Sequence, residues 1–577
     1  MKRLFFYIRE YRKECFLGPL FKLLEAAFEL IVPLIIADIV DKGIPGGNTL
    51  SIIRSSLLLV LLALIGLSAS VTAQYFAAKA AIGFSTNLRH ALFSHISSLS
   101  YSDLDHLGTS SLITRLTGDI NQLQSGVNLG LRLLLRSPFV VFGAVIMAFL
   151  IDTQSALIFV CVIAALFIIV FGIILGTMPM QRAVRSDLDQ VTSSTRENLS
   201  GVRVIRAFRR EEQETGRFSI LNEKLTKAQL RVGRFTAALN PVTYVVLNLA
   251  VIILLHVGAI RVDSGTLSQG QVIALYNYMS QILVELIKLA NLIVTLTKSA
   301  ACANRISDIL AVPSSQKDGN LVLSSSGIHS ISFDNVAVRY HSTGDPALEH
   351  ISFSAFTGQT IGIIGGTGSG KTTLVNLIPR FYDVSEGSVK INGTDIRNFS
   401  LSSLRSAIGF VPQHASLFRG TIRSNLLWGN PDATDSDINT AIHISQAAEI
   451  INSKPFGLDE EVQQGGRNFS GGQKQRLTIA RALVRKPAIL ILDDSASALD
   501  YATDAALRRS LRELSDPPIT FIVSQRTSSV RYADQIIVLD DGLCVGLGTH
   551  EELLESCPVY REIHYSQTAG EEGKHVR

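Results

Sequence analysis

A glycine-rich segment that ends in lysine and threonine offers the clearest chemistry in the chain. Residues 365–372 read GGTGSGKT and match the phosphate-loop pattern GxxxxGK[ST]. The glycines let backbone N–H groups close around phosphate oxygens, Lys371 neutralises the β- and γ-phosphates, and Thr372 offers its hydroxyl to Mg²⁺. The segment predicts a nucleoside-triphosphate site formed by Gly365, Gly366, Thr367, Gly368, Ser369, Gly370, Lys371, Thr372 and Thr373.

Two carboxylates follow a second apolar run. Residues 489–492 predict a buried strand, and Asp493 and Asp494 come directly after it. A carboxylate at a strand end can hold Mg²⁺ through water, which is the role predicted for Asp493. Apolar strands that end in aspartate are common in any parallel sheet, so this prediction depends on the phosphate loop.

The elements around the phosphate loop predict an α/β domain. Residues 360–364 form a buried-strand pattern that runs straight into the loop, and an apolar helix follows. Upstream, residues 313–327 contain serine, glycine and aspartate in the pattern of a linker. We therefore predict a nucleotide-binding domain over residues 328–577 and a different domain over residues 1–312.

Residues 1–312 are predicted to form a helical membrane domain. Apolar stretches of about 20 residues, long enough to cross the hydrocarbon layer as helices, predict six spans. About 50 residues separate spans two and three and about 60 separate spans four and five, and both stretches carry charged residues in helical patterns, whereas the other connections are short. The spans begin near Phe16, Ile52, Leu133, Ser155, Pro241 and Gln271.

Basic residues set the predicted orientation of the spans. Lysines and arginines precede span one and lie in both long loops, so the positive-inside rule places these segments in the cytoplasm. An even number of spans then returns the C-terminal domain to the same side. Residues 101–108 and 207–216 are predicted transverse helices that contact a soluble domain, with simple solvated turns as the alternative.

Several charged residues lie inside the predicted spans. Charge in hydrocarbon is costly unless it faces protein or a watery cavity. Glu25 and Glu29 share one helical face, as do Glu285 and Lys288. Two interpretations remain open: a polar cavity for cargo, or ion pairs within the protein with the outermost charges near the membrane surface.

Composition excludes some functions. Of the 577 residues, 47% are hydrophobic and 18% are charged, which suits one membrane part and one soluble part. The formal net charge of +4 gives no support for a nucleic-acid partner. The five cysteines form no CxxC pair, and we expect neither a disulfide nor a zinc site. The basic N-terminus lacks the pattern of a cleaved signal peptide.

A further motif lies between the phosphate loop and the aspartate pair. Residues 468–476 read NFSGGQKQR and resemble the signature of ABC transporters. Order and spacing also resemble that family at Gln413, the Q-loop position, at residues 497–500, the D-loop, and at Tyr340, the aromatic residue that stacks on adenine. The whole chain resembles an ABC exporter: an α-helical transmembrane domain of six helices with long intracellular extensions, fused to an α/β nucleotide-binding domain.

The resemblance implies a mechanism based on a dimer. Two nucleotide domains would meet head to tail, with each ATP and its Mg²⁺ between the phosphate loop of one domain and the signature of the other. ATP binding would close the dimer, hydrolysis would reopen it, and the transverse helices would carry the change to the spans. The implied signature contacts to ATP come from Ser470, Gly471, Gly472 and Gln473, and the implied metal-side residues are Thr372, Gln413 and Asp493.

Three positions depart from the family pattern. Asp494 stands where a glutamate usually polarises the attacking water, and its carboxylate is withdrawn by one methylene, a displacement that can cost about a hundredfold in rate. Gln525 replaces the switch histidine and cannot become cationic. Gln464 replaces a glutamate that usually precedes the signature. The implied catalytic residues are Asp494, Gln525 and Gln413, and their site is expected to be slow.

An intact signature beside a weakened ATP site resembles one subunit of a heterodimeric exporter. The expected partner is a second ABC half-transporter with the missing glutamate and histidine, and the alternative is a homodimer of two slow sites. The expected activity is ATP-driven outward transport of amphipathic drugs, lipids or peptides across a lipid membrane. The chain resembles bacterial plasma-membrane examples with both termini in the cytoplasm. An ATP-gated regulator or channel is the competing class, which Asp494 and Gln525 keep open.

Overall fold

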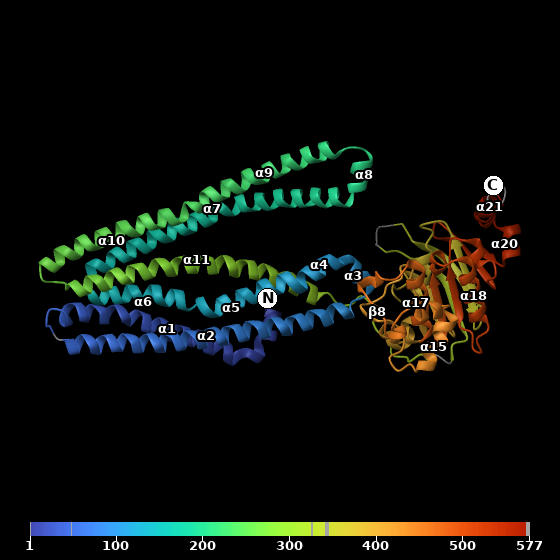
Figure 1. Cartoon of the computed structure of the whole chain (residues 1–577), viewed down its shortest axis with the longest axis horizontal. Coiled ribbons are helices and arrows are strands. Elements are labelled where there is room, and N and C mark those ends of the chain that lie inside the picture. The colour runs from blue at the N-terminus through green and yellow to red at the C-terminus, as the bar shows by residue number, and fades with distance from the viewer. Residues whose placement is uncertain (1, 48, 325–326, 341–344, 573–577) are drawn as a thin grey trace. The chain divides into compact units, whose positions relative to one another are not determined.

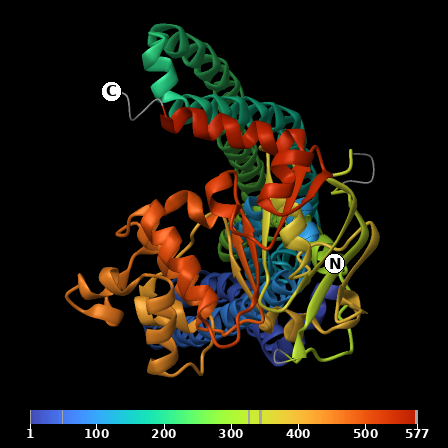
Figure 2. The same ribbon diagram turned by 90° about the vertical axis from the view of Figure 1, so that its right-hand side faces the viewer.

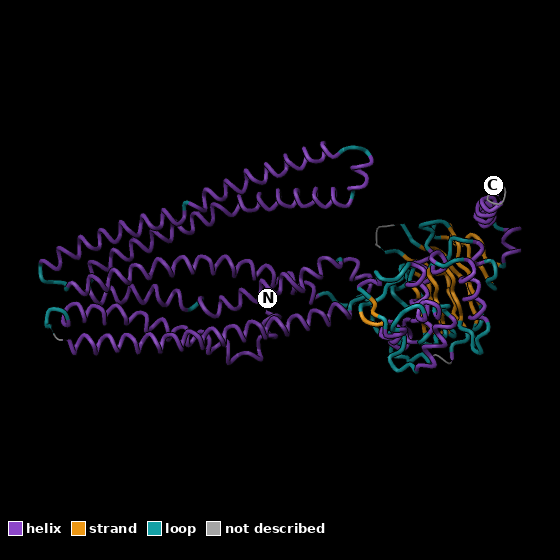
Figure 3. The backbone as a smooth tube through the Cα atoms, viewed as in Figure 1, coloured by secondary structure: helices purple, strands orange, loops and turns teal. Residues whose placement is uncertain are grey.

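The computed structural model of the chain describes residues 2–47, 49–324, 327–340 and 345–572. These residues form two compact units. The helical unit comprises residues 1–97 and 109–312, and the sheet unit comprises residues 98–108 and 313–577. Within the described residues, every strand lies in the sheet unit, as the orange segments of Figure 3 show.

Long apolar helices make up the helical unit (Figure 1). Among the described residues, five helical stretches are long and apolar enough to cross a membrane: Thr49–Ser98, Thr109–Ile151, Thr153–Ser200, Glu211–Asp263 and Gln269–Ala311. The elements in chain order are η1 (Lys2–Tyr11), α1 (Arg12–Asp38), η2 (Ile39–Gly43), α2 (Thr49–Ser98), α4 (Thr109–Thr114), η3 (Arg115–Asp119), α5 (Ile120–Leu133), α6 (Arg136–Ile151), α7 (Thr153–Ser200), α8 (Val202–Ala207), α9 (Glu211–Ala237), α10 (Leu239–Asp263) and α11 (Gln269–Ala311).

The predicted count of six spans is not confirmed. Helix α1, which contains the first predicted span, carries several charged residues and is not among the five apolar stretches. The tight connection predicted between spans three and four is confirmed. Helix α6 ends at Ile151 and α7 begins at Thr153, and the Asp152 carboxylate between them accepts a hydrogen bond from the Ser155 N–H at 2.8 Å.

One of the two predicted transverse helices is found where the sequence places it. Helix α3 (Tyr101–Leu107) starts at a capping box, in which Ser100 and Asp103 exchange hydrogen bonds, and ends at Gly108 with φ +74°. The second prediction, over residues 207–216, is wrong in position. The short helix there is α8, which ends at Ala207, because the chain turns back into helix directly after Gly201 caps α7.

A sheet of ten strands forms the centre of the sheet unit, in the order β5-β4-β1-β2-β12-β11-β3-β10-β9-β6. Strands β11, β3, β10, β9 and β6 are parallel neighbours, and the remaining pairs are antiparallel except β12 with β2. The strands are β1 (Ser330–Val338), β2 (Leu348–Phe356), β3 (Thr360–Gly365), β4 (Glu386–Ile391), β5 (Thr394–Asp395), β6 (Ile408–Val411), β9 (Ile489–Asp493), β10 (Ile519–Val523), β11 (Gln535–Asp540) and β12 (Leu543–Gly548).

Helices cover this sheet, and a small second sheet pairs β7 (Gly420–Thr421) with β8 (Glu461–Val462). Figure 2 shows the orange helices of residues 435–483 beside the strands. The helices and 3₁₀ turns are α12 (Lys371–Leu377), η5 (Ile396–Asn398), α13 (Leu401–Ser406), α14 (Ile422–Leu427), α15 (Asp435–Ile444), α16 (Ala448–Asn452), η6 (Gly457–Asp459), η7 (Gln464–Gly466), α17 (Gly471–Leu483), η8 (Ser495–Ala498), α18 (Tyr501–Arg512), α19 (Thr527–Val530), α20 (His550–Ser556) and α21 (Pro558–Glu572).

Alternate residues of the central strands enter two separate hydrophobic cores. In β9, Ile489 and Ile491 join one core, while Leu490 and Leu492 join the other. Burial on both faces explains why the sequence of β9 is continuously apolar. The carboxyl ends of β3, β9 and β10 meet at one edge of the sheet, so the residues that follow them come together.

Candidate nucleotide site

The phosphate loop connects β3 to α12. Gly370 caps α12 with φ +96°, a conformation that favours glycine, and a Cβ there would lie 2.8 Å from the carbonyl oxygen of Ala347. Lys371 is 9% exposed, and its ammonium donates to the carbonyl oxygens of Gly365 (2.9 Å) and Gly366 (2.5 Å). Burial lowers the pKa of Lys371 from its ordinary value. The loop therefore holds a buried amine at its centre.

A hydroxyl and a carboxylate face each other beside the loop. Asp493 ends β9 and accepts a hydrogen bond from the Thr372 hydroxyl at 3.2 Å. Burial raises the pKa of the Asp493 carboxyl above its ordinary value. Hydroxyl and carboxylate oxygens are ligands that Mg²⁺ prefers, and a cation between them would hold Asp493 in its ionised form. The donor set fits Mg²⁺.

Asp494 has an unusual backbone. Its φ of 46° and ψ of 28° are left-handed, and its N–H donates to the Val523 carbonyl at 3.0 Å. The Gln413 side chain donates to the Asp494 carboxylate at 3.3 Å. Gln413 and Asp494, both predicted as catalytic, are thus in direct contact.

These residues line one pocket with a free volume of about 360 Å³. Most of the residues predicted from the sequence to bind nucleotide or metal contribute to it, together with Asp494 and Gln525. Gly365 and Gly366 lie at the end of β3 just before the lining residues. The lining comprises Tyr340, Ala347, Thr367, Gly368, Ser369, Gly370, Lys371, Thr372, Thr373, Gln413, Asp493, Asp494, Val523 and Gln525.

Tyr340 forms one wall of this pocket. Its hydroxyl donates to the Thr373 hydroxyl at 3.0 Å, and its ring packs edge-on against Tyr382 with centroids 5.0 Å apart. An aromatic ring fixed at both its tip and its edge offers a flat surface to a purine base. The stacking role that the resemblance implies for Tyr340 stays a prediction.

The signature residues do not line the pocket. Ser470 caps α17. Its hydroxyl accepts a hydrogen bond from the Gln473 N–H at 3.4 Å, and its own N–H donates to the side-chain oxygen of Gln473 at 3.0 Å. A Cβ on Gly472 would lie 3.0 Å from the Ala498 carbonyl oxygen, so the helix start packs closely on the D-loop. Within one chain, the predicted signature contacts to ATP are not brought together with the phosphate loop.

Helix α3 is seated on aromatic residues of the sheet unit. Tyr101 packs on Phe381 with ring centroids 4.6 Å apart, and the Tyr382 hydroxyl donates to the Asp105 carboxylate at 2.7 Å. Because Tyr382 also contacts Tyr340, two aromatic rings separate α3 from the pocket. Sequence reasoning missed Tyr382, since no motif marks it.

Ion pairs neutralise the charges that the sequence places within the helical unit. Arg136 at the start of α6 is 6% exposed and pairs with Glu29 of α1 at 2.6 Å and with Glu285 of α11. Glu285 also accepts from Lys288 at 2.8 Å and from Ser137 at 2.8 Å. The interpretation as ion pairs therefore describes these side chains. Arg136 was missed as their partner, although a charge within an apolar stretch is a visible signal.

The same charges border a hollow, so the cargo interpretation stays open. Its free volume is about 320 Å³. Residues of α1 and α11 line it: Glu29, Val32, Pro33, Ile36, Asn277, Ser280, Gln281, Val284, Glu285 and Lys288.

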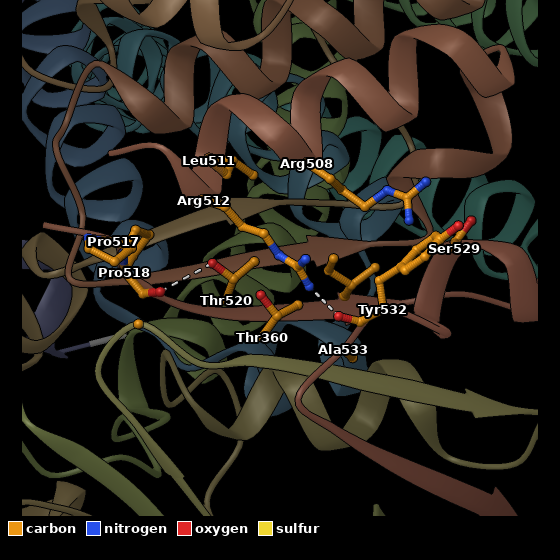
Figure 4. Close-up of a pocket in the computed structure, with 12 residues that line it drawn as sticks. Thr360, Arg508, Leu511, Arg512, Pro517, Pro518, Thr520, Ser529, Tyr532 and Ala533 are labelled. Carbon is orange, nitrogen blue, oxygen red and sulfur yellow. Dashed lines mark hydrogen bonds between the residues drawn. The ribbon is translucent and has the colours of Figure 1, made fainter. Parts of the chain in front are cut away.

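A second hollow in the sheet unit is too small for a nucleotide. Figure 4 shows Arg508 and Arg512 of α18 over Thr360 and Thr520, with the Arg512 guanidinium donating to the Tyr532 carbonyl. Its free volume is about 30 Å³, room for one or two water molecules. It also lies where β3 and β10 begin, whereas ligands of parallel sheets bind where strands end.

The fold and the pocket define a class of protein: a phosphate-loop ATPase domain fused to a helical membrane domain. The chain matches the ABC transporter transmembrane region over residues 15–286 and the ABC transporter family over residues 348–497. An uncharacterized ABC transporter ATP-binding protein of Mycobacterium tuberculosis is 37% identical over 571 residues, which cover 97% of each chain. The chain belongs to the ABC transporter family, and its ATPase domain binds ATP with Mg²⁺.

Further relatives extend over the same length. The ABC transporter ATP-binding protein YfiB of Bacillus subtilis is 34% identical over 99% of both chains. YgaD of the same species, whose name proposes multidrug export, is 31% identical over 98% of both chains. A solved bacterial Atm1-family ABC exporter with ATP bound superimposes with a TM-score of 0.79 at 24% identity, covering 97% of this chain and 98% of that one. This likeness shows that the chain has the exporter fold.

Proposed function

We propose that the chain is one half of a heterodimeric ABC exporter that moves amphipathic small molecules, lipids or peptides outward across a bacterial plasma membrane. Its own ATP site retains nucleotide and hydrolyses it slowly, and hydrolysis occurs mainly at the partner's site. The observation that carries this proposal is the contact between Gln413 and Asp494 in a pocket that also contains Gln525. Asp494 and Gln525, two of the departures from the family pattern, would thus act on the same nucleotide.

The short carboxylate supports slow hydrolysis. The Val523 carbonyl fixes the Asp494 backbone N–H, and the Asp494 carboxylate accepts from Gln413, so the carboxylate cannot advance further into the pocket without breaking the bond to Gln413. Catalysis depends strongly on position, and a misplacement of about 1 Å can cost about a hundredfold. Gln525 can donate a hydrogen bond to a γ-phosphate, but it cannot add the positive charge that a histidine can.

The signature supports a partner. At the start of α17, the N–H groups of Gly471 and Gly472 lie outside the chain's own pocket, where the phosphates of a second subunit's ATP would meet them. In this arrangement Ser470, Gly471, Gly472 and Gln473 serve the partner's site, and the roles assigned above to Tyr340, Thr372 and Asp493 serve the chain's own site.

We propose that helix α1 also crosses the membrane, as the first of six spans. Its charged Glu29 is paired with Arg136, and its Lys22 is paired with Glu25, which lowers the cost of placing the helix in hydrocarbon. Six spans put both termini in the cytoplasm, where ATP is available.

ATPase activity tests the proposal. The full chain is purified in lipid alone, together with a second ABC half-transporter that has the missing glutamate and histidine, and together with a variant of that partner whose catalytic glutamate is replaced by glutamine. We expect hydrolysis only with the intact partner. Strong hydrolysis by the chain alone would show that Asp494 suffices and that the asymmetric pair is wrong.

The competing function is an ATP-gated regulator or channel, favoured by the same two substitutions. The response to transported compounds distinguishes an exporter from a regulator or channel. Stimulation of the pair's ATPase by amphipathic compounds, together with their ATP-dependent accumulation in inside-out vesicles, supports export. ATP-dependent ion conductance without such accumulation supports the regulator.

A further inference from the structure

The C-terminal helix reaches the segment that contains the switch position. The side-chain N–H of Gln567, in α21, donates to the Gln525 carbonyl at 2.7 Å. Its side-chain oxygen accepts from the Thr527 N–H at 2.9 Å and from the Thr527 hydroxyl at 3.1 Å. A carbonyl can only accept and a backbone N–H can only donate, so both ends of this amide are assigned by chemistry.

The helix that carries Gln567 is itself firmly held. Tyr560 is fully buried, and its hydroxyl lies 2.7 Å from Nδ1 of His550. Val559 and Ile563 pack on the same core. Residues 560, 563 and 567 follow helical spacing, so Gln567 lies on the face of α21 that packs against the domain.

The two ends of the switch residue face different partners. The Gln525 side chain lines the nucleotide pocket, while its backbone carbonyl is bound by Gln567. On the other side, the Ser524 N–H donates to the Ile363 carbonyl of β3 at 3.0 Å. The switch backbone is thus fixed by β3 before Gln525 and by α21 at and after it.

We propose that Gln567 is a positioning residue that holds the backbone of Gln525 so that its side chain can reach the γ-phosphate of bound ATP. This inference rests on the proposed role of Gln525. A side chain that is fixed before the ligand arrives loses less freedom on binding, which strengthens the contact. ADP lacks the γ-phosphate, so the contribution of Gln567 is specific to ATP.

Binding of ATP and ADP to the full-length chain in lipid nanodiscs tests this role. Mant-labelled ATP and ADP are titrated against the wild type and against Gln567→Leu, which fills a similar volume without hydrogen bonds. We expect the affinity for ATP to fall by about threefold to tenfold, the range of one or two neutral hydrogen bonds, and the affinity for ADP to change by less than about twofold. Equal losses for both nucleotides would overturn the proposal in favour of a purely structural role.

Two further variants sharpen the comparison. Gln567→Glu keeps the acceptor for Thr527 but places an oxygen against the Gln525 carbonyl. It should therefore also lose affinity for ATP but not for ADP. If Gln567→Leu fails to fold, Gln567→Glu alone tests the proposal. Glu562→Gln, on the exposed side of α21, is the matched control and should bind both nucleotides as the wild type does. Wild-type discrimination in Gln567→Glu would contradict the proposal.

A double-mutant cycle shows whether Gln567 acts through Gln525. In a Gln525→Ala background, adding Gln567→Leu should leave the ratio of ATP to ADP affinity unchanged, because no side chain remains to be positioned. A further loss of ATP affinity in that background would overturn the route through Gln525. If Gln525→Ala binds ATP and ADP as the wild type does, the proposed role of Gln525 is wrong and the positioning role with it. If Gln525→Ala loses ATP affinity while the Gln567 variants keep the wild-type ratio of ATP to ADP affinity, the positioning role alone is wrong.

Discussion

Asp494 combines a short carboxylate with a left-handed backbone. Aspartate adopts this conformation several times more often than most residues, whereas a longer side chain gains nothing from it. The same residue type therefore satisfies the turn after β9 and limits how far the carboxylate reaches into the pocket. Backbone conformation and slow chemistry have a common cause at this position.

Asp494→Glu should raise ATP hydrolysis at this site. The added methylene extends the carboxylate toward the attacking water, and we expect the rate of the chain's own site to increase by about tenfold to a hundredfold. Because glutamate at position 494 must adopt the left-handed backbone, the variant should lose about 1 kcal/mol of the free energy of unfolding. Steady-state ATPase and thermal unfolding of the chain in lipid measure both effects.

The control is Asp494→Asn, which keeps the short side chain without its charge and should remain at the lowest rate. An Asp494→Glu variant no faster than the wild type would show that Gln525, or the absence of the partner, limits hydrolysis instead.

At the scale of elements, α3 depends on an aromatic seat. Tyr382→Phe removes the hydroxyl that donates to Asp105 but keeps the ring against Tyr340. Asp105 is exposed to solvent, so this bond should contribute about 1 kcal/mol, and the amides of α3 should exchange with deuterium about fivefold faster. Hydrogen–deuterium exchange of residues 101–107 measures the change.

The control variant for that experiment is Asp105→Asn, and amides around the nucleotide pocket serve as the internal reference. Asp105→Asn keeps an acceptor for the Tyr382 hydroxyl and should produce a smaller increase in the exchange of residues 101–107. Exchange that is unchanged in Tyr382→Phe would mean that the stacking of Tyr101 on Phe381 is enough to hold α3.

Arg136 joins its own helix, α6, to α1 and α11 through the carboxylates of Glu29 and Glu285. Arg136→Ala leaves Glu285, which is 3% exposed, without its buried partner, and removing one member of a buried ion pair typically costs about 3–5 kcal/mol. We expect a marked loss of thermal stability in lipid. Glu29→Gln is the matched control because the Glu29 side chain is 41% exposed, and its effect should be small.

A combined variant separates structure from cargo binding. Arg136→Met with Glu285→Gln removes the pair without leaving a buried charge and should recover most of the stability. If its ATPase then no longer responds to amphipathic compounds, the charges contribute to the cargo site. If Arg136→Ala is as stable as the wild type, the two carboxylate contacts of Arg136 do not hold the helices together.

Local patterns predicted residues that the fold brings to one pocket, whereas contacts between distant segments were not predictable. The residues that line the pocket follow β3, β9 and β10, and parallel strands bring their carboxyl ends to one edge. Gln567 meets Gln525 across 42 residues, and Arg136 meets Glu285 across 149, so only tertiary packing reveals them. The transverse helix near residue 207 was misplaced because Gly201, not the polar cluster after it, ends the long helix.

At the scale of the whole molecule, helix α1 decides whether the number of spans is odd or even. In the part of the chain that the structure describes, five stretches are apolar enough to cross on their own, and crossings by these alone would leave the two termini on opposite sides of the membrane. If α1 also crosses, both termini lie in the cytoplasm. The basic residues before α1 favour this arrangement.

Protease protection of terminal tags determines which arrangement holds, and labelling of single cysteines determines on which side of the membrane the connections lie. In a chain whose five cysteines are replaced by serine, single cysteines are placed at Gly46 and Ser264, in the turns after α1 and α10, and at Gln213 in α9. With α1 as a span, a membrane-impermeant maleimide should label Gly46→Cys and Ser264→Cys in intact cells, whereas Gln213→Cys should react only after permeabilisation. An N-terminal tag that is digested by external protease, with a protected C-terminal tag, would show that α1 does not cross. Because the positive-inside bias and the ion pairs of Glu29 both favour insertion, we expect protection of both tags in cells and digestion of both in inside-out vesicles.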